Sequence, residues 1–80
     1  MTVDETQADK IVDGRFLEPP EPFLLTMEAL DTIRPGETVL LRLCREPLPL
    51  YRALQLNGYA WETSCLDDGT FEILIRHRAE

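Results

Sequence analysis

The sequence predicts a two-layer α/β sandwich, in which a four-stranded mixed sheet carries two helices on one face. Two segments with helical spacing of apolar residues each follow a short apolar run and a proline-rich stretch. The last part of the chain alternates apolar and polar residues on both sides of Asp67-Asp68-Gly69, a strong hairpin signal. The element order is therefore β-α-β-α-β-β, and right-handed crossovers would put both helices on the same face of the sheet.

Prolines separate the first predicted strand from the first predicted helix. We predict a short strand over about residues 10–16, which the following prolines end because proline cannot donate a sheet hydrogen bond. A helix tolerates Pro20 and Pro22 in its first turn, and this one ends before the turn at Arg34-Pro35-Gly36. From Glu21 onward the apolar helical face comprises Phe23, Met27 and Leu30, with Leu24 and Ile33 flanking the same side.

The second half of the chain repeats the arrangement. Residues 38–44 have the length and β-branched content of a strand, and a second proline-rich stretch leads into a helix that ends at Asn57-Gly58. Residues 59–65 and 71–76 are the two alternating strands of the hairpin. We expect Arg42 and Glu62 on the open face of the sheet, either facing solvent or paired across strands.

Size and charge limit the classes of function. Eighty residues with 44% hydrophobic side chains suffice for one small core, so we expect a flexible tail over residues 1–9 and a single domain over residues 10–80. The net charge of -7 disfavours nucleic acid and anionic membrane surfaces, both of which attract basic proteins. No apolar run approaches the roughly 20 residues that span a bilayer, and we expect no secretory signal because the first ten residues are acidic and polar. We therefore expect a cytoplasmic protein whose two cysteines are free thiols.

The two proline-rich stretches predict one binding edge. Each follows a strand and opens a helix, and parallel first and second strands would bring both helix N-termini to the same edge of the sheet. The carboxylates there have two interpretations: they cap the helices and compensate their dipoles, or they form a cluster that binds a cation or a basic partner. A metal site is not predicted, because no histidine or ligand spacing accompanies the carboxylates. The candidate binding residues are Arg15, Glu18, Glu21, Arg45 and Glu46.

The same residues resemble a known family. The chain is similar to the TusA-like (SirA-like) sulfur-carrier domain over about Ile11 to His77. The similarity lies in the order of its segments: a strand, "DGRFLEPPEP", an amphipathic helix, "RPGE" and a second strand. Pro20-Glu21-Pro22 matches the Pro-x-Pro of that family's Cys-Pro-x-Pro motif, and the family's cysteine falls on Pro19.

The chain most resembles an uncharacterised branch of that superfamily, a domain of unknown function that lacks the cysteine. The branch carries an Asp-His-Asp-Pro-x-Pro-Leu-like stretch before its second helix, which here is "CREPLPL" over residues 44–50. The Pro-x-Pro-Leu part is kept, but Arg45 stands at the position where the branch has its histidine. The segments "YAWE" and "FEILIR" also fit the branch.

The resemblance implies that sulfur-carrier chemistry is absent at the first helix. A carrier needs a thiolate, which a helix N-terminus favours by lowering the pKa of a cysteine, and Pro19 has no nucleophile. Cys44, at the end of the second strand, is the candidate substitute thiol, although free cysteines more often pack as small buried hydrophobes. Cys65 is expected in the core beside Tyr59 and Trp61, although Trp61 could instead belong to a partner-binding patch. His77 is expected as an exposed strand residue rather than a catalytic base.

Two functions follow as expectations. The first is a non-catalytic interaction or regulatory domain that docks another protein, a protein domain or a small ligand at the predicted edge. The alternative is a sulfur-carrier or redox protein that uses Cys44. An enzyme is the less favoured reading, and we expect no cofactor, no nucleic acid and no membrane as a partner.

Overall fold

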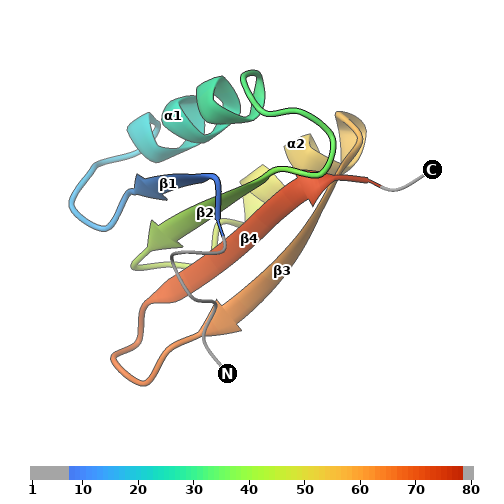
Figure 1. Ribbon diagram of the computed structural model, residues 1–80. Helices are drawn as coiled ribbons and strands as arrows, with labels where there is room; N and C mark the ends of the chain where they lie inside the picture. Colours follow the sequence, from blue (N-terminus) through green and yellow to red (C-terminus); the bar gives the residue numbers. More distant parts are fainter. Residues whose placement is uncertain (1–7, 79–80) are drawn as a thin grey trace.

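The computed structural model describes residues 8–78 and confirms the predicted order of elements (Figure 1). The predicted N-terminal tail lies mostly outside the described residues. Neither helix within residues 8–78 is long and apolar enough to cross a membrane. The elements are β1 (Lys10–Asp13), α1 (Glu21–Leu30), β2 (Thr38–Leu43), α2 (Leu48–Leu56), β3 (Tyr59–Cys65) and β4 (Phe71–His77).

The strands form one mixed sheet in the order β1-β2-β4-β3. β1 and β2 are parallel neighbours, with Asp13 opposite Arg42 at their ends. β4 lies between β2 and β3 and is antiparallel to both, so β2 and β3 run in the same direction. The carboxyl ends of β1 and β2 therefore meet at one edge, and the chain leaves that edge twice to begin a helix.

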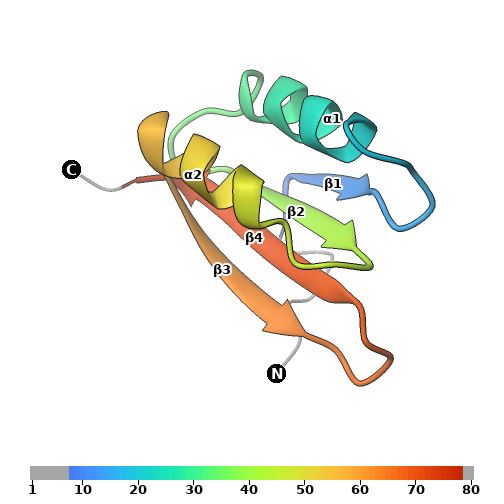
Figure 2. The ribbon, with the colours of Figure 1, turned by 180° about the vertical axis from the view of Figure 1, so that it is seen from behind.

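Both helices pack on one face of the sheet, as Figure 2 shows from the helix side. Side chains of a strand alternate between the faces, so every second residue of β2 and β4 points toward the helices. One continuous core cluster results, and it joins α1, α2 and the sheet. Its buried members are Leu30, Ile33, Val39, Leu41, Leu50, Leu54, Tyr59, Ile73 and Ile75.

The buried side of α1 is rotated from the predicted one. The fully covered positions are Pro22, Thr26 and Leu30, while the predicted face residues Phe23 and Met27 are partly buried against the core. The prediction that Leu24 flanks the apolar side is wrong, because its side chain is 58% exposed. Thr26 can occupy the buried stripe because its hydroxyl donates to the Pro22 carbonyl at 2.7 Å.

The first strand is also shorter than predicted, and it ends at Asp13 rather than at residue 16. Gly14 still donates to the Arg42 carbonyl at 2.8 Å, but Leu17 then donates back to the Gly14 carbonyl in a turn. Phe16, which would have been the last strand residue, is exposed.

The other face of the sheet carries no helix and holds the polar cross-strand pairs. Arg42 on β2 donates from Nε to the Glu72 carboxylate on β4 at 3.1 Å. Arg76 on β4 lies 3.8 Å from the Glu62 carboxylate on β3. Arg42 and Glu62 thus both lie on the open face as predicted, and each pairs across strands, Arg42 with Glu72 and Glu62 with Arg76.

Candidate functional site

The β1–α1 and β2–α2 connections enclose a groove, which we call the edge groove. It has a volume of about 610 Å³. The β1–α1 connection forms one wall, the β2–α2 connection forms the other, and the core closes the bottom. Its lining residues are Gly14, Arg15, Leu17, Pro19, Pro20, Pro22, Phe23, Leu41, Leu43, Cys44, Arg45, Glu46, Pro47, Pro49 and Leu50.

The inside of the edge groove is apolar and rigid. Its floor includes Leu41 and Leu50, which are both core residues. Five of the six prolines of the chain lie in its walls, which leaves only Pro35 outside. Proline has no backbone N–H and a fixed φ, so these walls offer few hydrogen-bond donors and keep their shape. The inside of the groove is therefore mainly apolar and offers few backbone donors.

Gly14 allows the two walls to come together. A Cβ atom at this position would lie 2.8 Å from Leu43 Cδ2 and 2.9 Å from Pro22 Cβ. Contacts this short do not occur between packed side chains, so a larger residue would force Leu43 or Pro22 to shift. Both of these residues line the groove, and the glycine therefore allows their close approach.

Neither helix start has the side-chain cap expected from the glutamates. The N-cap positions are Pro20 and Pro47, and no side chain accepts a hydrogen bond from the first turn of either helix. Glu21 is the only one of the three glutamates in a first turn, where it can interact with the helix dipole. Side-chain capping, which is part of the first of the two interpretations, is therefore wrong, because proline occupies the N-cap position of each helix.

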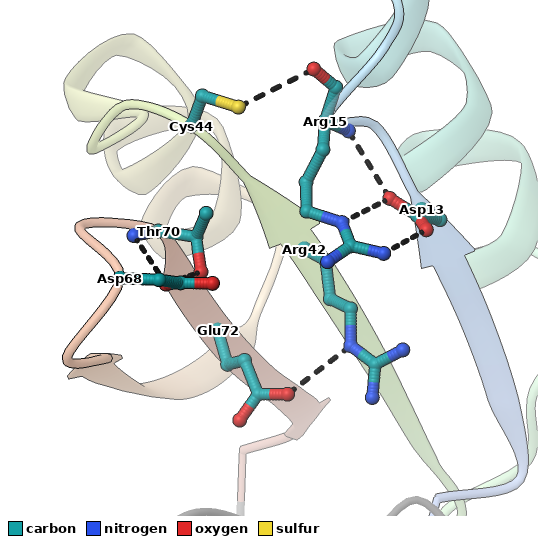
Figure 3. A network of polar contacts seen from close by, with 7 residues as sticks. All are labelled: Asp13, Arg15, Arg42, Cys44, Asp68, Thr70 and Glu72. Carbon is teal, nitrogen blue, oxygen red and sulfur yellow. Dashed lines mark hydrogen bonds and ion pairs between the residues drawn. The ribbon is translucent and has the colours of Figure 1, made fainter.

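The polar groups at the rim are mostly engaged with one another (Figure 3). Arg15 donates to both carboxylate oxygens of Asp13, from Nε at 2.9 Å and from Nη2 at 2.7 Å. These hydrogen bonds lower the pKa of Asp13 to about 2. On the opposite wall, the Tyr51 hydroxyl donates to the Glu46 carboxylate at 3.2 Å and lies 2.6 Å from the Thr63 hydroxyl.

Cys44 lines the edge groove just beyond the end of β2, and its side chain is exposed. Its thiol lies 3.3 Å from the Arg15 carbonyl, to which it donates across the groove (Figure 3). Cys65 is also exposed, so its predicted burial beside Trp61 is wrong. The physical reason is that Cys65 ends β3 next to the hairpin loop, which extends beyond both helices (Figure 2).

The structure brings together some of the predicted binding residues and leaves others outside. Arg15, Arg45, Glu46 and Cys44 all line the edge groove. Glu18 and Glu21 are exposed and do not line it. The sequence predicts a binding edge at the two proline-rich stretches, but it does not show that the prolines form the walls of a groove. Their occurrence at both helix starts was the signal for the groove walls.

His77 is not the exposed strand residue that the sequence suggested. It is half-buried, its Nε2 lies 3.2 Å from the Ile33 carbonyl, and its ring packs at 5.1 Å on Tyr59. Residues 8–78 contain no group of three or more His, Cys, Asp and Glu side chains that could hold a metal ion.

Comparison with known proteins places this arrangement in a family. No curated protein matches the chain. The crystal structure of the SirA-like protein from Desulfitobacterium hafniense is similar, with a TM-score of 0.77 and 19% identity. The similarity covers 88% of this chain and 99% of the other, which shows a shared fold.

A family model described as "Uncharacterized conserved protein (DUF2249)" matches residues 11–77. The resemblance inferred from the motifs is thus confirmed for both the superfamily fold and the branch. The chain belongs to the DUF2249 family.

Proposed function

We propose that this protein is a non-catalytic binding domain that holds a small, largely apolar ligand in the edge groove. The observation that carries the proposal is the groove itself, an apolar cavity of about 610 Å³ with a rigid proline wall on each side. Small-molecule sites span about 300–1,000 Å³ and combine an apolar lining with a few polar groups. The edge groove has both properties.

Its place in the fold supports the same proposal. In open α/β sheets, ligands bind beyond the carboxyl ends of parallel strands, where loops lead into helices. The edge groove lies at that position for β1 and β2. In sulfur-carrier relatives the start of the first helix holds the reactive cysteine, whereas here Pro19 lines the groove. We infer that the site binds without the chemistry of that thiol. Binding of another protein and a cytoplasmic location stay predictions.

The proposal is tested with a neutral apolar probe, N-phenyl-1-naphthylamine, whose fluorescence rises when it leaves water. We expect saturable binding to the wild type. A Cys44→Trp variant fills the groove from its wall and should weaken binding by about tenfold or more, equivalent to about 1.4 kcal/mol. Thermal unfolding establishes that each variant remains folded.

The matched control is Cys65→Trp, which adds the same side chain at an exposed cysteine outside the groove. It should leave probe affinity within about twofold of the wild type, a change below 0.5 kcal/mol. Absence of saturable binding to the wild type, or equal losses in the two variants, would show that the groove is not the binding site.

The exposure of Cys44 in the groove favours one second candidate, a thiol carrier. In that reaction the Cys44 thiolate attacks the outer sulfur of a donor persulfide. A new sulfur–sulfur bond forms at Cys44, the donor bond breaks, and the donor leaves as a thiolate with no net oxidation. Incubation with a persulfide donor should then add one sulfur atom to Cys44 and none to Cys65, as read by mass spectrometry. Equal labelling of the two cysteines would eliminate this candidate.

A further inference from the structure

We propose that the ligand of the edge groove is an amphiphile with an apolar body and one anionic group, and that Arg45 binds that group. This inference rests on the proposed function and specifies the chemistry of the ligand. It follows from the charges that line the groove, from which of them already have partners, and from the lack of donors deeper inside.

The lining contains three charged side chains. Arg15 donates from Nε and Nη2, which form one edge of its guanidinium, to both carboxylate oxygens of Asp13, so its charge is largely compensated. The Glu46 carboxylate accepts a hydrogen bond from the Tyr51 hydroxyl, so one of its oxygens is directed toward α2. Arg45 is exposed, and within residues 8–78 it has neither a hydrogen bond nor an ion pair. Arg45 is therefore the lining charge that can pair with a ligand at no cost to an existing contact.

The position of Arg45 suits an anion at the mouth of the groove. It lies between Cys44 at the end of β2 and the start of α2, above the apolar floor. A guanidinium presents N–H groups in a planar fork that matches a carboxylate with two parallel hydrogen bonds. The positive ends of α1 and α2 at the same edge reinforce the preference for an anion, although the inference does not depend on them.

The rest of the ligand must be apolar. Below the rim the groove presents leucine, phenylalanine and proline side chains, including Leu43, Leu50 and Phe23. A polar group placed there would lose its hydrogen bonds to water without replacement, a cost of about 1–3 kcal/mol for each group. A cationic head group would be repelled by Arg45, and Glu46, the single lining carboxylate, already accepts a hydrogen bond from Tyr51. These charges distinguish an anionic amphiphile from a neutral or cationic one.

Three ten-carbon probes with different head groups test the inference: decanoate, 1-decanol and decyltrimethylammonium, each below its aggregation threshold. Their affinities are measured by displacement of N-phenyl-1-naphthylamine at low ionic strength. We expect decanoate to bind the wild type about fivefold more tightly than decanol, the upper range for an exposed ion pair, and decyltrimethylammonium to bind most weakly. The advantage of decanoate should shrink as salt is added.

Arg45→Gln should remove the advantage of decanoate and leave decanol affinity unchanged. The control is Arg52→Gln, which removes an exposed arginine on α2 outside the groove lining and should change neither affinity. The inference is overturned if decanoate and decanol bind the wild type equally, or if the advantage survives in Arg45→Gln. Binding of decanol without preference for decanoate would leave the proposed function standing, whereas absence of any probe binding would overturn both.

Discussion

The Arg42–Glu72 ion pair is more buried than the Asp13–Arg15 and Glu62–Arg76 pairs. Glu72 is only 4% exposed, although it lies on the face of the sheet without helices. Its Oε2 accepts from Arg42 Nε at 3.1 Å, while Oε1 is buried without a hydrogen-bond partner among the described residues. A buried charge is costly to leave uncompensated, so this ion pair differs from an ordinary surface pair.

Arg42→Met should lower the free energy of unfolding by about 3 kcal/mol, because it leaves the Glu72 carboxylate buried without its cation. Urea denaturation measures the change. The matched control is Arg76→Met on β4, whose partner Glu62 lies 3.8 Å away and is exposed, and which should cost at most about 1 kcal/mol.

The double variant Arg42→Met/Glu72→Met removes both charges and should recover most of the lost stability. If it is as unstable as Arg42→Met alone, Arg42 stabilises the sheet by packing rather than by compensating Glu72.

At the scale of elements, the β1–α1 connection couples stability to the shape of the site. Gly14→Ala should lower the free energy of unfolding by about 1–3 kcal/mol, because the new methyl group meets Leu43 and Pro22 at less than 3 Å. The same displacement alters the wall of the edge groove, so affinity for N-phenyl-1-naphthylamine should also change.

A glycine variant elsewhere separates these two effects. Gly69→Ala, in the hairpin loop, has open space around the added methyl group but a backbone φ of 85° that disfavours alanine. It should cost about 1 kcal/mol and leave probe affinity unchanged. A change of probe affinity in Gly69→Ala equal to that in Gly14→Ala would show that lower stability alone, and not the groove wall, is responsible.

The elements were predictable because their signals are local. Helical spacing, prolines in first turns and the Asp-Gly hairpin each depend on a few neighbouring residues, and all six elements occur where these signals lie. The insertion of β4 between β2 and β3 is a pairing between distant segments, and the sequence did not predict it. The alternation of side chains along β3 places Cys65 on the helix side of the sheet. It does not show how far the helices extend along the strand, and neither helix covers the end where Cys65 lies.

The candidate site was predictable only in part for a similar reason. The two proline-rich stretches each lead from a strand into a helix, and parallel strands bring both helix starts to one edge. That reasoning correctly predicted that Arg15, Arg45, Glu46 and Cys44 lie together there. The groove itself depends on how side chains from distant segments pack, such as Gly14 against Leu43 and Pro22. Such close packing has no sequence signal beyond the glycine itself.

The whole molecule depends on a single core cluster that joins both helices to the sheet. Leu30 of α1, Leu54 of α2 and Ile73 of β4 are members of this cluster. Domains this small have a net stability of only a few kcal/mol, so the loss of one core contact removes a large part of it. A shared core also means that no layer can unfold alone without exposing the apolar surface of the others.

Leu54→Ala should therefore lower the free energy of unfolding by about 2–5 kcal/mol, because it opens a cavity at a fully buried position of α2. Leu56→Ala, two residues along the same helix, removes the same atoms from a side chain that is 75% exposed and should change stability by at most about 0.5 kcal/mol.

Unfolding is followed both by Trp61 fluorescence, which reports the stack of Trp61 on Tyr51 of α2, and by far-ultraviolet circular dichroism, which reports all elements. The two midpoints should coincide in the wild type and shift together in Leu54→Ala, as a single cooperative unit requires. Separate midpoints would show instead that α2 and β3 form a unit that unfolds independently of the parallel β1–α1–β2 half.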